Sequence, residues 1–91
     1  MKPFRVYADP GHAWIAVKEK LLIEFDIADK ITPYSYFKGK TVYLEEDCDA
    51  STFVEAFVKK FGVEPVFAKE NHVNWSHPIR KYRRYIYTGK A

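Results

Sequence analysis

The sequence has few of the residues that build cross-linked or glycine-rich proteins. Cys48 is the single cysteine, and glycine occurs four times in 91 residues. One thiol excludes an intramolecular disulfide framework and any zinc site made of four cysteines. Four scattered glycines leave no glycine-rich loop of the kind that holds a phosphate group. The functions that depend on these devices are therefore excluded.

Long apolar runs are also missing. The longest, such as residues 21–23, contain only a few residues, whereas a membrane-spanning helix needs about 20. Residues 1–5 contain no apolar segment of the kind found in a secretory signal. We therefore expect no membrane partner and a location in the cytoplasm.

The composition is that of a folded domain. Hydrophobic residues make up 47% of the chain and aromatic residues 18%, which is too apolar for a disordered protein. The length suits one domain near the lower end of the usual size range. No linker, internal repeat or low-complexity tract divides the chain, so we expect a single compact domain over residues 1–91.

Alternating apolar and polar residues predict an antiparallel sheet of four or five strands. Residues 4–17 form one expected hairpin, and residues 34–45 form a second hairpin with residues 38–40 as its loop. Residues 63–68 are a strand candidate at a sheet edge, because Pro65 donates no backbone hydrogen bond. Residues 69–78 are expected to be a loop. Residues 79–87 are interpreted as a strand, with a helix entered through Pro78 as the alternative.

One helix is predicted over residues 49–61. Asp49 is expected to cap its first turn and Gly62 to end it. One or two further helical turns are expected at residues 18–25, where helix and strand signals compete. The predicted fold class is α+β, with the small sheet packed on one face only by the main helix. The apolar stripe of that helix consists of Phe53, Val54, Phe57, Val58 and Phe61.

Positive charge is concentrated at the end of the chain. The formal net charge is +3, but residues 76–91 hold five basic and no acidic residues. We call residues 79–87 the basic-aromatic segment. Tyrosine and arginine dominate protein-binding hot spots, so the first hypothesis is an interaction module that binds a protein partner here. The candidate partner-binding residues are Arg80, Lys81, Tyr82, Arg83, Arg84, Tyr85 and Tyr87.

Nucleic acid is the alternative partner of this segment. Cations neutralise phosphates while tyrosine rings stack on bases, which is how single strands are bound without sequence preference. A net charge of +3 is a weak footprint for such binding, and no helix-turn-helix, zinc-finger or RRM-type pattern is present. A charged edge strand that blocks aggregation between sheets is the purely structural interpretation.

An acidic run precedes the predicted helix. Glu45, Glu46 and Asp47 form a candidate acidic patch, which suits a basic partner or a hard cation. The spacing of an EF-hand loop is absent, and acids before a helix also stabilise its dipole. His72 and His77 have the loose spacing of a zinc pair, but only the fold would supply further ligands. We therefore expect no metal and no cofactor.

Enzymatic chemistry is the second alternative to a binding module. Cys48 precedes a helix, which lowers the pKa of a thiol, but the adjacent Asp47 and Asp49 disfavour another negative charge. The sequence places no histidine beside Cys48 as a base, so we expect a small buried thiol and no catalysis. Because a small aromatic chain often leaves an apolar face uncovered, a homodimer is a further expectation.

Two segments resemble small uncharacterised proteins encoded by bacteriophages and related mobile elements. One segment reads YSYF at residues 34–37 and TVYLEEDCDA at residues 41–50, and the other reads DPGHAW at residues 9–14. The resemblance implies expression in the cytoplasm of a bacterial host cell and an accessory role in which the protein binds a host component. It carries over no catalytic or binding residue.

Overall fold

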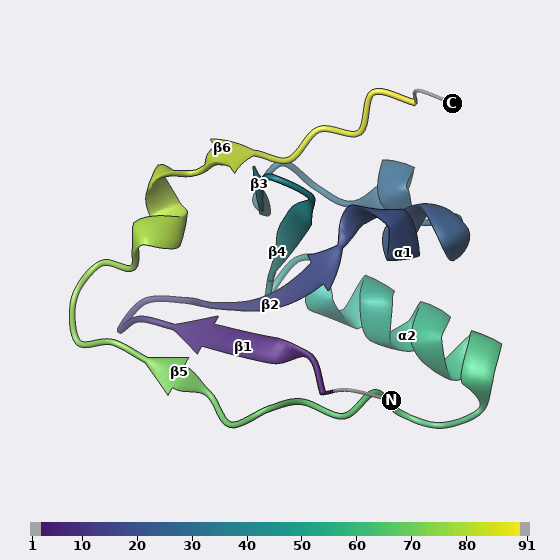
Figure 1. The fold of residues 1–91 in the computed structure, drawn as a ribbon, viewed down its shortest axis with the longest axis horizontal. Helices are drawn as coiled ribbons and strands as arrows, with labels where there is room; N and C mark the ends of the chain where they lie inside the picture. The colour runs from purple at the N-terminus through teal and green to yellow at the C-terminus, as the bar shows by residue number, and fades with distance from the viewer. Residues whose placement is uncertain (1–2, 90–91) are drawn as a thin grey trace.

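The structure is a computed structural model that describes residues 3–89. Its centre is a six-stranded mixed sheet in the order β5-β1-β2-β4-β3-β6 (Figure 1). The predicted α+β class is confirmed, although the sheet has six strands rather than four or five. The strands are β1 (Arg5–Ala8), β2 (Ala13–Lys18), β3 (Tyr36–Lys38), β4 (Thr41–Glu45), β5 (Asn71–His72) and β6 (Arg83–Arg84). The helical elements are α1 (Glu19–Glu24), η1 (Ala28–Lys30), α2 (Ala50–Phe61) and η2 (Pro78–Lys81).

Both predicted hairpins are present. β1 pairs with β2, and β3 pairs with β4, in each case antiparallel. Asp9 closes the first turn, because its carboxylate accepts the backbone N–H of Gly11 and of His12. The second turn is one residue shorter than predicted, because Lys38 still belongs to β3 and Gly39 adopts a φ of 63°. β2 and β4 also pair, which joins the two hairpins into one sheet.

The sheet differs from the prediction after α2. Residues 63–68 form no strand, apart from an isolated bridge between Phe67 and Phe4. β5 lies instead in the segment expected to be a loop, and it pairs with β1 in parallel. The pairing is parallel because residues 63–72 run alongside β1 in the same direction (Figure 1). Pro65 donates no backbone hydrogen bond, which keeps pairing along this stretch sparse.

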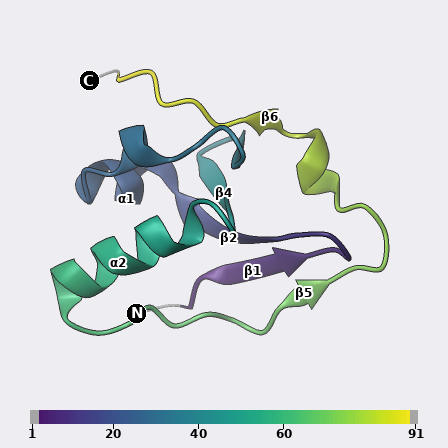
Figure 2. The same cartoon turned by 180° about the vertical axis from the view of Figure 1, so that it is seen from behind.

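α2 covers one face of the sheet (Figure 2). Phe53 and Phe57 are buried in one core cluster with Ile15, Val17 and Leu44. The stripe is narrower than predicted, because Val58 and Phe61 are 36% and 43% exposed. Both residues lie toward the end of α2, where the helix extends beyond the strands (Figures 1 and 2).

Asp49 holds a loop rather than the helix that it precedes. It occupies the N-cap position of α2, but its side chain makes no capping hydrogen bond. Its carboxylate accepts the backbone N–H and hydroxyl of Thr32 and the hydroxyl of Ser35. Ser35 in turn accepts the backbone N–H of Glu45. The fully buried Asp49 therefore fixes the loop that leads into β3 beside the end of β4.

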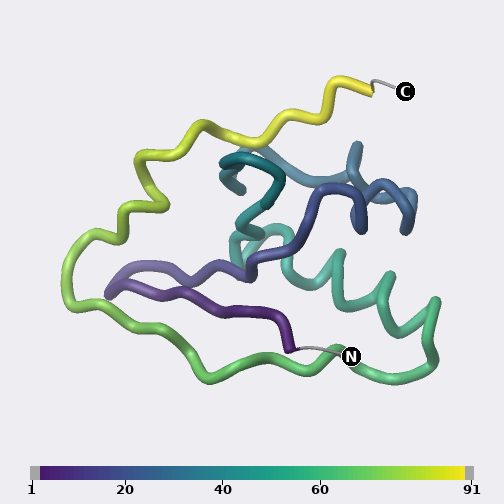
Figure 3. The backbone as a smooth tube through the Cα atoms, viewed as in Figure 1, coloured from purple at the N-terminus to yellow at the C-terminus, as the bar shows by residue number. Residues whose placement is uncertain are grey.

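The end of the chain covers part of the other face, which we call the second face. Residues 73–82 pass around the β1–β2 turn (Figure 3), where the backbone N–H of His77 donates to Asp9. The His77 ring lies 6.0 Å from that of Trp14, which faces away from α2. Trp14 and Ile79 are each 1% exposed and lie outside the cluster under α2. The main helix thus packs on one face as predicted, but the second face, expected to be uncovered, is covered in part by the end of the chain.

The basic-aromatic segment is neither of the two predicted elements over its whole length. Pro78 opens the 3-10 turn η2, and only Arg83 and Arg84 form strand β6, which pairs with β3. One or two helical turns were expected at residues 18–25, and the six-residue helix α1 confirms them. None of the helices in the described part of the chain is long and apolar enough to cross a membrane.

Candidate functional site

The second face is divided by charge. Side chains alternate between the two faces of a strand. The pairing registers therefore show which side chains lie side by side, in rows across the strands, on the second face. One end row contains Tyr7, Trp14 and Glu45, and the opposite end row contains Lys18, Thr41 and Lys38. The first end carries acidic groups and the second carries lysines, and the two ends are therefore candidate sites for different ligands.

The acidic end contains a recess of about 290 Å³. It brings together the acidic run and the basic-aromatic segment, which are remote in sequence. Aromatic side chains of Trp14, Tyr34 and Tyr36 line it together with ionisable ones. Those ionisable groups are His12, Glu45, Asp47, Cys48, Arg80 and Arg84. We call this set of nine residues the recess.

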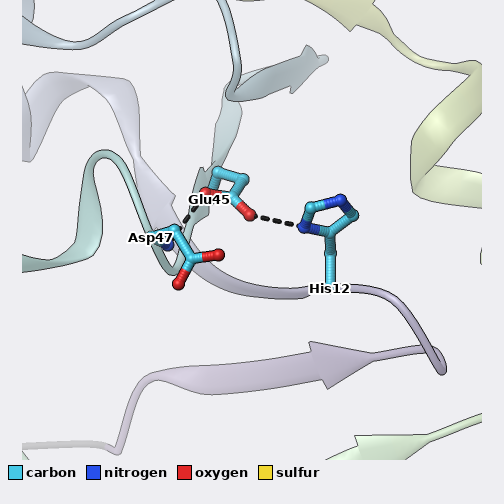
Figure 4. Close-up of side chains that lie close together, drawn as sticks. All are labelled: His12, Glu45 and Asp47. Atoms are coloured by element: carbon cyan, nitrogen blue, oxygen red, sulfur yellow. Dashed lines mark hydrogen bonds and ion pairs between the residues drawn. The ribbon is translucent and has the colours of Figure 1, made fainter.

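Glu45 is the most ordered acid of the recess. Its side chain is 7% exposed, and its Oε1 accepts the backbone N–H groups of Asp47 and Cys48 at 2.8 and 3.1 Å. Its Oε2 lies 2.8 Å from Nδ1 of His12, which comes from the β1–β2 turn (Figure 4). The predicted acidic patch is therefore not continuous at the surface, since Glu46 and Asp47 are exposed and Glu45 is buried.

Cys48 is exposed, whereas a buried thiol was predicted. Loss of solvation is the largest cause that raises the pKa of this thiol, followed by the carboxylates of Glu45, Asp49 and Asp47. The reactive form of cysteine is the thiolate. These surroundings favour the protonated thiol and argue against Cys48 as a nucleophile.

Arg80, one of the predicted partner-binding residues, is bound within the molecule. Its Nε and Nη2 donate to the two carboxylate oxygens of Asp9 at 2.6 and 2.9 Å. The Asp9 side chain is 1% exposed. The hydrogen bond from Arg80 is the largest influence on Asp9 and, against the opposing effect of burial, holds the pKa of that carboxyl well below its usual range. Arg80 therefore fixes η2 to the β1–β2 turn.

Two tyrosines of the basic-aromatic segment also have internal partners. Tyr85 is fully buried in the core, and its hydroxyl donates to Glu19 Oε2 at 2.8 Å. Burial, and then Glu19, raise the pKa of Tyr85 above its ordinary value. Tyr82 packs on Tyr43 with ring centroids 5.3 Å apart. Tyr87 is half-buried against the core.

The remaining members of the segment keep exposed charges. Arg84 donates to the Pro33 carbonyl oxygen at 3.1 Å and lies over the ring of Tyr36. Arg83 lies over Phe37, and Lys81 is exposed. The segment thus serves partly to close the second face and is not one free binding strip.

The basic end contains a site that the sequence analysis missed. Arg5, Lys18 and Lys20 line a groove of about 400 Å³ together with Tyr7 and Tyr43. Lys40 lines an adjoining hollow with Lys18 and Lys20. Lys38 lies opposite Thr41 and places its ammonium 4.7 Å from the ring centre of Tyr82. We call Arg5, Lys18, Lys20, Lys38 and Lys40, with Tyr7, Tyr43 and Tyr82, the basic groove.

The cations of the basic groove are not neutralised. Within residues 3–89, none of the five forms an ion pair with a carboxylate. Tyr43 adds one hydroxyl group to this surface as a neutral donor, because burial first, and then Tyr82 and Tyr7, raise its pKa. The five cations are spread over residues 5–40 of the sequence, so no local charge run indicates them. The available signal was limited to Arg5 and Tyr7, which share one face of β1.

The zinc pair considered from sequence is not assembled. In the described chain, the groups close enough to share a metal ion are His12, Glu45 and Asp47, whereas His72 and His77 are not among them. Comparison with family models, curated proteins and solved structures finds no match to this chain. The site must therefore be interpreted from its own geometry.

Proposed function

We propose that this chain is a non-enzymatic binding module whose basic groove holds single-stranded nucleic acid. One observation carries the proposal: five cations without ion-pair partners in the described chain lie in or beside a groove lined by tyrosines. Proteins that bind single strands combine a positively charged groove for the phosphates with aromatic rings for the bases. The basic groove supplies both groups on one surface.

The tyrosine row has the contacts that a stacking surface needs. The ring of Tyr43 lies 6.0 Å from that of Tyr7 and 5.3 Å from that of Tyr82. All three rings are half-buried, so each keeps part of its surface accessible to a base. Arg5 and Tyr7 share β1, and Lys18 lies on the neighbouring strand β2. The phosphates and the bases of a bound nucleic acid therefore have partners close to one another.

This surface is favoured over the basic-aromatic segment. Both hypotheses from sequence depended on residues 79–87, where Arg80 binds Asp9 and Tyr85 lies in the core. Neither of these residues is available without disrupting the fold. The lysines of the basic groove are exposed and support the nucleic-acid hypothesis at a different place.

Fluorescence anisotropy with a labelled 20-mer of deoxythymidine tests the proposal. We expect binding that weakens steeply with salt, because each phosphate contact releases counterions. Lys18→Gln with Lys20→Gln is expected to weaken binding about tenfold at low salt and to flatten the slope of log K against log salt by about 1.4.

Lys59→Gln with Lys60→Gln is the matched control. It removes the same charge from exposed positions in the last turn of α2, on the other side of the sheet. We expect its affinity to stay within about twofold of the unchanged protein, since the phosphates do not reach it. No binding at low ionic strength, or an equal loss in both double variants, would contradict the proposal.

A protein partner at the recess is the second candidate. The observation that favours it is that Arg84 and Asp47, two exposed groups of opposite charge, line one hollow with Tyr34, which is 62% exposed. Such a surface suits a polypeptide with both acidic and basic side chains. In the phage-type accessory role that the resemblance implies, the partner is a host protein in the bacterial cytoplasm.

Affinity capture from a nuclease-treated bacterial lysate tests this candidate. Arg84→Glu is expected to abolish capture of a specific protein that the unchanged chain retains. Arg83→Glu is the control, because Arg83 is equally exposed but does not line the recess. Equal capture by both variants would remove the recess from consideration.

A further inference from the structure

We propose that His12, Glu45 and Asp47 form a binding site for a divalent transition-metal ion such as Zn²⁺ or Mn²⁺. The site lies in the recess, which shares no residue with the basic groove. It is therefore independent of the proposed nucleic-acid site. No metal was expected from the sequence because His12 is remote from the acidic run, whereas in the fold the β1–β2 turn brings His12 beside Glu45 (Figure 4).

The three side chains converge at distances suited to one ion. Each offers a ligand atom, one nitrogen and two oxygens, and all three atoms lie within 4.8 Å of one another. Ligands about 2.0–2.2 Å from a zinc ion lie about 3–3.6 Å apart. To bind one ion, the exposed Asp47 carboxylate has to approach the other two groups. Nδ1 of His12 and Oε2 of Glu45, which are 2.8 Å apart in a hydrogen bond, have to separate slightly, so that the ion replaces the shared proton.

Glu45 is held ready for this role. Its Oε1 is occupied by two backbone N–H groups, so the buried carboxylate presents Oε2 toward His12 at 2.8 Å. A ligating carboxylate that is itself hydrogen-bonded is typical of metal sites, because the outer contacts fix its orientation. When Nδ1 of His12 binds the ion, the ring proton is carried on Nε2, and the 44% exposure of the side chain lets solvent exchange it.

The charges around the site permit a cation. Glu45 and Asp47 provide carboxylates, while Arg80 on the same recess is already compensated by Asp9. Arg84 is the remaining cation of the recess, and its guanidinium is engaged with Tyr36 and Pro33. Imidazole suits Zn²⁺, whereas carboxylates suit Mn²⁺, Mg²⁺ and Ca²⁺. Ca²⁺ also needs six to eight oxygen ligands. One nitrogen with two oxygens therefore selects Zn²⁺ or Mn²⁺ over Ca²⁺.

Calorimetric titration of the purified chain with zinc chloride, manganese chloride and calcium chloride tests the inference. We expect saturable binding of one zinc or manganese ion and no measurable binding of calcium. Asp47→Asn and His12→Ala are each expected to weaken binding at least about tenfold. Zinc should also raise the melting temperature of the unchanged protein, because a ligand of the folded state stabilises it.

Glu46→Gln is the matched control. Glu46 is exposed and lies next to Asp47 in the sequence, but it is outside the cluster. The substitution removes one negative charge there. Its affinity is expected to stay within about twofold, and NMR should show zinc shifting the His12 ring signals and not those of His72. Circular dichroism of each variant confirms that it is folded. The inference fails if no ion binds at millimolar concentration, or if Glu46→Gln weakens binding as much as Asp47→Asn. It also fails if Cys48→Ser alone abolishes binding.

Discussion

α2 and residues 77–82 cover opposite faces of one sheet, and different contacts hold them there. α2 packs through side chains repeated at helical spacing, so that Phe53 and Phe57 share one continuous apolar cluster. Residues 77–82 contain only the short 3-10 turn η2 and depend on separate contacts, above all the ion pair of Arg80 with the buried Asp9. Stability is therefore spread over many contacts on one face and concentrated in a few polar bonds on the other.

Phe53→Ala should give the largest loss of stability. Phe53 is fully buried and its ring contacts those of Phe4, Phe25 and Phe57. Removing a buried phenylalanine ring typically costs about 3–5 kcal/mol of unfolding free energy. Urea unfolding measures the change. Phe61→Ala, at the exposed end of the same helix, is expected to cost about 1 kcal/mol or less. Equal losses would show that the apolar contacts of α2 are not concentrated over the sheet.

Arg80→Met tests the second face in the same way. It leaves Asp9 buried with three backbone donors, those of Gly11, His12 and His77, but without a counter-charge. Breaking a buried pair typically costs about 3 kcal/mol or more, and we expect a loss near that lower value, measured by urea unfolding. Arg83→Met removes the same charge from an exposed position and should change stability by less than about 0.5 kcal/mol. A loss no larger for Arg80→Met than for Arg83→Met would mean that the ion pair does not hold η2 in place.

The comparison also explains what could be predicted from the sequence. The α2 helix is a local pattern, and its positions 50–61 and the left-handed Gly62 follow from residues within one stretch. The two hairpins are local as well. β5 and β6 contain two residues each and exist only because the folded chain places them beside β1 and β3. β6 lies within residues 79–87, which were interpreted as a strand, whereas β5 lies where a loop was predicted, because a two-residue pairing leaves no periodic signal in the sequence.

The candidate sites show the same division. The acidic run and the basic-aromatic segment were both identified, and the structure places Glu45, Asp47 and Arg84 on one recess. The sequence does not indicate which residues of the acidic run and of the basic-aromatic segment bind partners within the molecule. Asp9 and Arg80 are 71 positions apart, and His12 and Glu45 are 33 apart. Such pairs depend on the topology of the sheet, as does the basic groove.

Acid should weaken the second face before the first. The folded-state pKa of Asp9 lies well below its ordinary value of 3.8. The stability that this carboxylate contributes is therefore fully present above pH 4 and is lost as the pH falls further. Between pH 4 and pH 2.5 we expect the stability of the unchanged protein to fall more steeply than that of Asp9→Asn, by at most about 1.4 kcal/mol per pH unit. Urea unfolding at each pH measures both slopes, and parallel slopes would show that Asp9 titrates normally.

Tyr85→Phe should give the smallest loss of stability, because it removes only one hydrogen bond. Tyr85 connects the end of the chain to the core under α2. Tyr85 follows β6 but lies in the core under α2, where its ring packs on Phe37 at 5.4 Å. Phenylalanine keeps that packing and loses only the bond to Glu19, whose side chain is half-buried and regains water. We expect a loss of about 1 kcal/mol in urea unfolding. Tyr87→Phe is the control and should lose less than about 0.5 kcal/mol. If Tyr85→Phe is also neutral, the ring alone holds the end of the chain, and the second face depends on the Asp9–Arg80 pair as its main polar contact.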